Sequence, residues 1–169
     1  NGKWTEVLVF DARITPEPEN LNYPERVWEL LNEGVVAQKA REYDRAEAIF
    51  QNVLTEDPTN ASAIYNTCVI WLNRDGRKGR VNAIERLKKL QQESPSYLMA
   101  PIALAQMAGE DGDFKTAHDL FTSVFKERTL NTMEAISLFI AQIDVALHEK
   151  NPEAAQIAFR ALVEIADPD

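Results

Sequence analysis

The residues that could act as nucleophiles or proton carriers are few and lie far apart in the sequence. There is one cysteine, Cys68, and there are two histidines, His118 and His148. The sequence contains no His-x-x-x-His pair, no glycine-rich phosphate loop and no Gly-x-Ser-x-Gly elbow. A cysteine at a packing position of a helix is usually structural, and so we interpret Cys68. These observations predict that the protein is not an enzyme, and that it has no metal and no cofactor.

A short acidic segment contains oxygen ligands of the kind that calcium prefers. Residues 110–113 read Glu-Asp-Gly-Asp, but their spacing does not match that of a calcium-binding loop. We therefore interpret this segment as the turn between two helices.

Positive charge is concentrated between residues 74 and 89. This stretch holds seven of the 18 basic residues and only two acidic ones, giving it a net charge of +5 in a chain of net charge −9. The cluster could recruit an acidic protein segment or a phosphate group, with Arg74, Arg77, Lys78 and Arg80 as the candidate contacts. The alternative is a solvated loop. Because no aromatic residues alternate with the basic ones, single-stranded nucleic acid is a poor candidate.

Length and composition suit a single globular domain. The chain has 169 residues, of which 45% are hydrophobic and 27% charged. The net charge argues against binding to nucleic acid or to an anionic membrane, and no apolar stretch is long enough for membrane insertion. A single cysteine cannot form an internal disulfide and fits a cytoplasmic protein. Because the sequence has no initiator Met and ends in Asp-Pro-Asp, we expect a fragment of a longer protein.

Residues 1–24 form an extended N-terminal segment with a proline-rich linker. Residues 3–11 are rich in β-branched and aromatic types, which predicts a short strand, and Pro16, Pro18 and Pro24 then interrupt regular structure. A lone strand needs a partner. It could plug a groove of its own chain, give self-association with another copy, or be the remnant of a preceding domain.

From residue 25 onward the apolar pattern is helical and repeats. Ala46, Phe50, Val53 and Pro58 have the offsets 0, +4, +7 and +12, and the same offsets start again at Ala83. Ala117 and Ala155 repeat the first three of them. The intervals between these alanines are 37, 34 and 38 residues. A period near 34 residues with two helices per unit is typical of tetratricopeptide repeats.

The chain resembles the tetratricopeptide repeat family over roughly residues 25–168. In the first unit, Leu30, Gly34 and Ala37 match the first helix of the motif, while Tyr43, Ala46, Phe50 and Pro58 match the second. The second unit has Cys68 in place of a small residue and about three inserted residues near 73–80. The fourth has Ile143 at the small-residue position. The resemblance implies an all-α, right-handed superhelical solenoid over residues 25–169, with repeats at about 25–60, 61–96, 97–131 and 132–168.

Each marker residue has a packing role in this interpretation. Small residues such as Gly34 let two helices approach closely. The large residues at the +4 offset are expected to fill the space between one helix pair and the next. These are Phe50, Leu87, Phe121 and Phe159.

In the family, first helices line a concave groove that binds partners. Mapping by repeat position gives candidate partner-binding residues, which are Trp28, Leu31, Val35, Tyr65, Asn66, Val69, Leu72, Met99, Ile102 and Gln106. Exposed apolar patches usually mark interaction sites. The alternative is that some of these residues belong to the ordinary core. Asn66 falls where related repeats hold a ligand backbone, and the apolar character of the groove favours an apolar peptide or an amphipathic helix.

The sequence thus predicts a non-catalytic protein–protein interaction scaffold or adaptor with a protein or peptide partner. The alternative is a regulatory or substrate-recruiting module of a larger multidomain protein or enzyme.

Overall fold

The structure is a computed structural model that describes residues 24–127, 130 and 132–166. All regular secondary structure in these ranges is α-helical, which confirms the predicted fold class. The predicted strand at 3–11 and most of the proline-rich linker lie outside the described residues.

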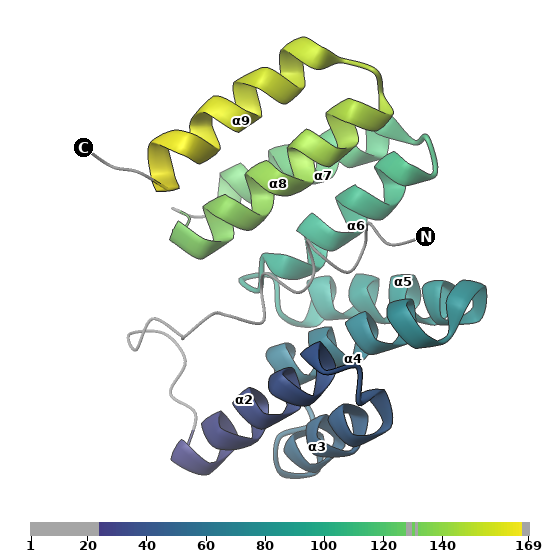
Figure 1. The fold of residues 1–169 in the computed structure, drawn as a ribbon. Coiled ribbons are helices and arrows are strands. Elements are labelled where there is room, and N and C mark those ends of the chain that lie inside the picture. Colours follow the sequence, from purple (N-terminus) through teal and green to yellow (C-terminus); the bar gives the residue numbers. More distant parts are fainter. Residues whose placement is uncertain (1–23, 128–129, 131, 167–169) are drawn as a thin grey trace. The chain divides into compact units, whose positions relative to one another are not determined.

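The described helices come one after another as four neighbouring pairs (Figure 1). Each pair is a helical hairpin, as the repeat pattern predicts. The pairs are α2 (Glu25–Lys39) with α3 (Tyr43–Glu56), α4 (Ala61–Arg74) with α5 (Gly76–Glu93), α6 (Met99–Glu110) with α7 (Phe114–Glu127), and α8 (Thr132–His148) with α9 (Pro152–Ala166).

The chain divides into two compact units, with the border between Leu90 and Gln91. Unit 1 holds α2, α3, α4 and most of α5. Unit 2 holds the end of α5 and the helices α6 to α9. The sequence predicts one domain over 25–169, whereas the border lies inside a helix. The predicted repeat borders stay a prediction.

Short polar residues cap the first turns of several helices. The side chain of Asn60 accepts a hydrogen bond from the backbone N–H of Ala63 at 3.0 Å, which caps α4. Asp113 accepts one from the N–H of Thr116 at 3.1 Å, and Asn151 accepts one from the N–H of Ala154 at 3.1 Å. Each cap satisfies a donor that the first helical turn leaves without a partner. Residues 111–113 form the predicted turn between α6 and α7, with Gly112 at φ +82°, while Glu110 is the last residue of α6.

Small residues bring α2 and α3 together in unit 1. A Cβ built on Gly34 would lie 2.6 Å from Cε1 of Phe50, so the phenylalanine ring occupies the space beside the glycine. Ala46 is fully buried in the same region. This hairpin and α4 share a core of buried apolar side chains, which are Val27, Leu31, Ala37, Ala46, Ile49, Phe50, Val53, Ala63 and Ile70.

The inserted residues of the second repeat are helical. The basic stretch 74–89 is helical and not a loop, because a single residue, Asp75, separates α4 from α5. Gly79 in the first turns of α5 packs against the backbone carbonyl of Trp71 in α4, where a side chain would collide. The insertion therefore lengthens α5 and brings its first turns onto the end of α4.

The prediction that Phe159 lies in the interior is also wrong. Phe50, Leu87 and Phe121 are buried at the same repeat position, but Phe159 is 55% exposed. In the fourth repeat Ile143 replaces the small residue that Gly34 provides in the first. No helix comes after α9 within the described residues. Phe159 thus has no glycine opposite it in its repeat, and no described helix after α9 covers it.

Candidate functional site

Most of the predicted partner-binding residues are buried in the structure. Seven of the ten are buried, namely Leu31, Tyr65, Asn66, Val69, Met99, Ile102 and Gln106. Three others are half-buried, namely Trp28, Val35 and Leu72. Leu31 belongs to the core of the first hairpin, and Val35 packs against that core. The side chains that offer surface to a partner in this conformation are therefore the three half-buried ones, and all three belong to unit 1.

Two of the buried candidates carry side-chain amides. Asn66 donates a hydrogen bond from Nδ2 to the backbone oxygen of Ser62 at 2.8 Å, while its Oδ1 has no hydrogen-bond partner among the described residues. Gln106 donates from Nε2 to Oδ2 of Asp144 at 3.4 Å, a contact between α6 and α8. A buried acceptor without a partner is costly, but Asn66 Oδ1 offers no surface to a partner in this conformation.

In the basic cluster, Arg74 forms ion pairs with carboxylates, whereas Arg77 and Lys78 are exposed. Arg74 donates to Oε2 of Glu47 at 2.6 Å, to Oδ1 of Asp44 at 3.0 Å and, through Nε, to Oδ1 of Asp75 at 2.7 Å. The hydrogen bond with Asp75, and after it the one with Glu47, raises the pKa of Arg74. The same guanidinium holds the pKa of Asp75 below its usual value. Arg74 thus joins α3 to α4, and its charge is compensated within unit 1.

The other candidates of the basic cluster lie in the first turns of α5. Arg77 and Lys78 are exposed, whereas Arg80 is half-buried. They lie within about one turn of a helix rather than in a loop. Of the four predicted contacts, Arg77 and Lys78 therefore offer the most accessible positive charge.

Cys68 is a packing residue, as predicted. It is fully buried in α4, and burial raises the pKa of its thiol to about 12. A thiol with this pKa stays protonated at neutral pH, and the thiolate is the reactive form.

His118 lies on the surface of α7 with Nε2 3.2 Å from Oε2 of Glu149. Within the described residues, no group of three or more His, Cys, Asp or Glu side chains could hold a metal ion.

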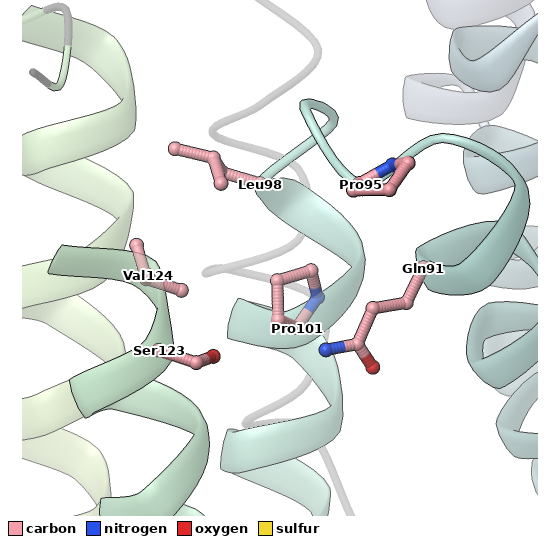
Figure 2. A pocket seen from close by; sticks show the side chains of 6 residues that line it. All are labelled: Gln91, Pro95, Leu98, Pro101, Ser123 and Val124. Carbon is pink, nitrogen blue, oxygen red and sulfur yellow. The ribbon is translucent and has the colours of Figure 1, made fainter. Parts of the chain in front are cut away.

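A small pocket in unit 2 lies beside the start of α6. Its volume is about 170 Å³, and its walls come from the end of α5, the connection after it, α6 and α7 (Figure 2). The lining residues are Gln91, Pro95, Leu98, Pro101, Ser123 and Val124. The Ser123 hydroxyl donates to the backbone oxygen of Leu120 at 2.7 Å. With no titratable group in its lining and less volume than ordinary ligand sites, it has room for one small apolar side chain.

Exposed apolar side chains on α8 and α9 form a feature that the predicted binding residues do not include. Leu147 is 62% exposed, Phe159 55% and Val163 47%. Repeat position puts Leu147 on a first helix, in line with the predicted groove residues, whereas it puts Phe159 in the interior. The available sequence signal is Ile143, which stands where the first repeat has Gly34.

None of the described helices is both long and apolar enough to cross a membrane.

A comparison with protein-family models finds no match to the chain, and a comparison with curated proteins finds none either. Among solved structures, a tetratricopeptide repeat protein from Parabacteroides merdae ATCC 43184 is similar, with a TM-score of 0.58 and 14% sequence identity. The alignment covers 95% of this chain and 59% of that one, so the chain spans little more than half the length of its structural neighbour. At this identity the likeness concerns the fold, which is that of tetratricopeptide repeat helical arrays.

Proposed function

We propose that the chain is a non-catalytic protein-interaction module that binds an apolar peptide or an amphipathic helix on the first helices of unit 1. The observation that carries this proposal is the incomplete burial of apolar side chains on α2 and α4. Trp28, Val35 and Leu72 keep part of their surface exposed within a fold used for helical repeat arrays. Repeat proteins typically bind along such first helices.

The buried neighbours give this surface a rigid support. Tyr65 and Val69 lie in α4 among fully buried residues and fix the backbone that presents Leu72. Affinity would come from burial of a few apolar anchors, each contributing about 1–3 kcal/mol.

The absence of catalysis is part of the proposal and rests on the state of the reactive groups. Cys68 is buried with a pKa of about 12, and His118 interacts with a surface carboxylate. Neither histidine lines the pocket of unit 2. None of these groups is placed to activate a bound substrate.

The experiment is affinity capture from an extract of the native source, with three forms of the full chain as bait. Leu72→Glu places a charge on the proposed surface. Val36→Glu adds the same charge on α2 at a side chain that is 65% exposed and lies outside the proposed contacts. The proposal predicts a protein that the parent and Val36→Glu retain and that Leu72→Glu loses. All three forms are first compared by circular dichroism.

Purified partner and a Trp28→Ala variant then supply the quantitative test. Loss of a central aromatic anchor is expected to weaken binding about tenfold or more. Equal affinity of Leu72→Glu, Trp28→Ala and the parent would show that the first helices of unit 1 are not the binding surface. Tyr65→Ala is a poor variant for this purpose, because Tyr65 is fully buried and its truncation would leave a cavity.

A second candidate function is recruitment within a larger protein, as a regulatory or substrate-recruiting module. The observation that favours it is the greater length of the structural neighbour, of which this chain spans 59%. A full-length reading frame that encodes a catalytic domain beside this chain would support it, and one without such a domain would oppose it.

The exposed Arg77 and Lys78 stay candidates for a separate contact with an acidic segment or a phosphate group. A double Arg77→Gln, Lys78→Gln variant that captures the same proteins as the parent would remove this contact from the proposal.

A further inference from the structure

The side of α5 opposite its buried residues carries exposed basic side chains. The buried side of this helix consists of Gly79, Ala83, Leu87 and Leu90. The exposed side includes Arg77, Lys78, Val81 and Lys88. At about 100° per residue, the three basic side chains leave the helix within about 60° of the direction of Val81. We call these four residues the basic face.

The positive charge of the basic face has little compensation within the chain. Among the described residues, Arg77 and Lys88 form no ion pair. Lys78 lies near enough to Asp75 to help lower the pKa of that carboxyl. Both oxygens of Asp75, however, already accept hydrogen bonds from Arg74, at 2.7 and 3.1 Å. The basic face therefore presents positive charge that an incoming carboxylate can pair with.

The start of α5 adds to this excess of positive charge. Arg77 and Lys78 lie in the first turn of the helix, and this turn contains no acidic residue. The positive end of the helix dipole disfavours basic side chains at this place. The two side chains thus lower the stability of α5, and an anionic group bound beside them would relieve the repulsion.

The order of residues along α5 favours a protein segment over nucleic acid or lipid headgroups. Val81 comes one turn after Lys78 and is 60% exposed, so apolar surface lies between the basic ends. Glu85 comes one turn later and repels a continuous row of phosphates. From Lys78 to Lys88 the face measures about 15 Å along the helix axis. A DNA duplex presents about nine negative charges over this length, and the basic face could compensate three of them at most.

We propose that the basic face binds an acidic segment of another protein, whose carboxylates pair with the three basic side chains and whose apolar side chain covers Val81. Two carboxylates about 15 Å apart match the ends of the face, which corresponds to about five residues of an extended chain. The proposal rests on the candidate contact of Arg77 and Lys78 described above. It is independent of the first-helix surface that contains Trp28, Val35 and Leu72.

Four labelled probes test the proposal against the full chain. The first is a peptide of about 12 residues, or about 40 Å when extended, with a central leucine between two pairs of glutamates. The second has alanine in place of the leucine, and the third has lysine in place of the glutamates. The fourth is a DNA duplex of about the same length. Fluorescence anisotropy at an ionic strength of about 0.15 M is expected to show the first peptide binding at least tenfold more tightly than the third and fourth probes.

Charge-removing variants locate the site. The double variant Arg77→Gln, Lys78→Gln is expected to weaken binding of the first peptide at least fivefold, and Lys88→Gln at least twofold. Lys39→Gln is the matched control for Lys88→Gln, because it removes one exposed positive charge from α2 in the same unit. It should leave the affinity unchanged. Since all these side chains are exposed, the variants are expected to keep the helix content of the parent.

Two further variants separate the apolar contact from the first-helix surface. Val81→Ser should weaken the leucine peptide at least twofold and leave the alanine peptide unchanged, because only the leucine covers Val81. Trp28→Ala should bind the first peptide as the parent does. A loss in Trp28→Ala as large as that in the double variant would place the acidic peptide on the first helices and overturn the proposal.

Other outcomes would overturn the proposal as well. Tighter binding of the duplex than of the first peptide would make nucleic acid the occupant. Equal losses in Lys88→Gln and Lys39→Gln would reduce the effect to the net charge of the chain. If sedimentation shows a parent dimer that the double variant dissociates, and the first peptide does not bind, the occupant is a second copy. A monomeric chain that does not bind the first peptide would leave the basic face a solvated surface.

Discussion

The ring of Phe50 occupies the space that a side chain on Gly34 would need. A Cβ on this glycine would lie 2.6 Å from Cε1 and 2.8 Å from Cζ of Phe50. Phe50 is fully buried, so the ring has no open space into which it can retreat. The close packing of α2 on α3 therefore depends on the absence of a side chain at residue 34.

Gly34→Ala is expected to lower the free energy of unfolding. Replacing glycine by alanine within a helix gains about 1 kcal/mol of helix propensity. Overpacking of a filled core costs about 1–3 kcal/mol, and here the added carbon meets a ring that is enclosed on all sides. The overlap therefore outweighs the propensity, with an expected net loss of up to about 2 kcal/mol. Urea unfolding followed by circular dichroism measures it.

The Phe50→Leu substitution supplies the control for this prediction. The shorter side chain makes space beside residue 34, so Gly34→Ala should cost less in the Phe50→Leu background than in the parent. A cost that is the same in both backgrounds would show that the two residues do not interact.

Phe50 and Phe159 occupy the same repeat position and should differ strongly in their contribution to stability. Phe50→Ala removes a fully buried ring and is expected to cost about 3–5 kcal/mol. Phe159→Ala removes a ring that is 55% exposed and should cost about 1 kcal/mol or less. Urea unfolding of both variants tests the difference. Similar losses would mean that Phe159 is covered in solution.

The repeat pattern predicts the fold because the residue types that let helices pack closely, and those that end helices, can be recognised in the sequence. Small residues such as Gly34 and Ala46 recur where helices touch, and Pro58 stands where a helix must end. Their intervals fix the number and order of the hairpins. The structural role of Cys68 is predictable for the same reason, since it stands at a small-residue position of a helix.

The candidate site is harder to predict because burial depends on neighbours that the pattern does not specify. Tyr65 and Met99 occupy first-helix positions like that of Leu72, yet they are buried. The position of Phe159 predicts an interior residue, but its exposure depends on whether a further helix packs on α9. Arg74 belongs to a cluster of basic residues in the sequence, whereas the carboxylates that compensate it, Asp44 and Glu47, lie about 30 residues earlier.

Glu47 joins the first hairpin to α4 and should be more important than its neighbour Asp44. Oε1 of Glu47 accepts a hydrogen bond from Nε1 of Trp71 at 2.9 Å, and Oε2 accepts one from Arg74 at 2.6 Å. Glu47→Ala leaves both donors without this carboxylate and is expected to cost about 1–2 kcal/mol of unfolding free energy.

Asp44→Ala is the matched control, since Asp44 bonds the same guanidinium at 3.0 Å from a side chain that is 97% exposed. An exposed ion pair contributes little, and the expected cost is about 0.5 kcal/mol or less. Thermal or urea unfolding compares the two. An equal effect of both substitutions would indicate that the hydrogen bond of Trp71 contributes nothing measurable.

The Cys68 thiol is expected to be unreactive in the folded chain and to make stability fall at alkaline pH. Burial raises its pKa from 9.0 to about 12. Below about pH 9 the thiol is protonated in both the folded and the unfolded chain, so it does not make the free energy of unfolding depend on pH. Between about pH 9 and 12 the unfolded chain releases the proton while the folded chain keeps it. The free energy of unfolding therefore decreases with rising pH in this window, by up to about 1.4 kcal/mol per pH unit.

Two measurements check this prediction. At pH 8, a thiol reagent such as dithionitrobenzoate should label Cys68 in urea but not in the native chain. Between pH 9 and 12, the stability of the parent should fall more steeply than that of Cys68→Ala, because other titrating groups contribute equally to both. Rapid labelling of the native chain would show that α4 opens often enough to expose the thiol. Parallel pH profiles would show that burial does not raise the pKa of Cys68.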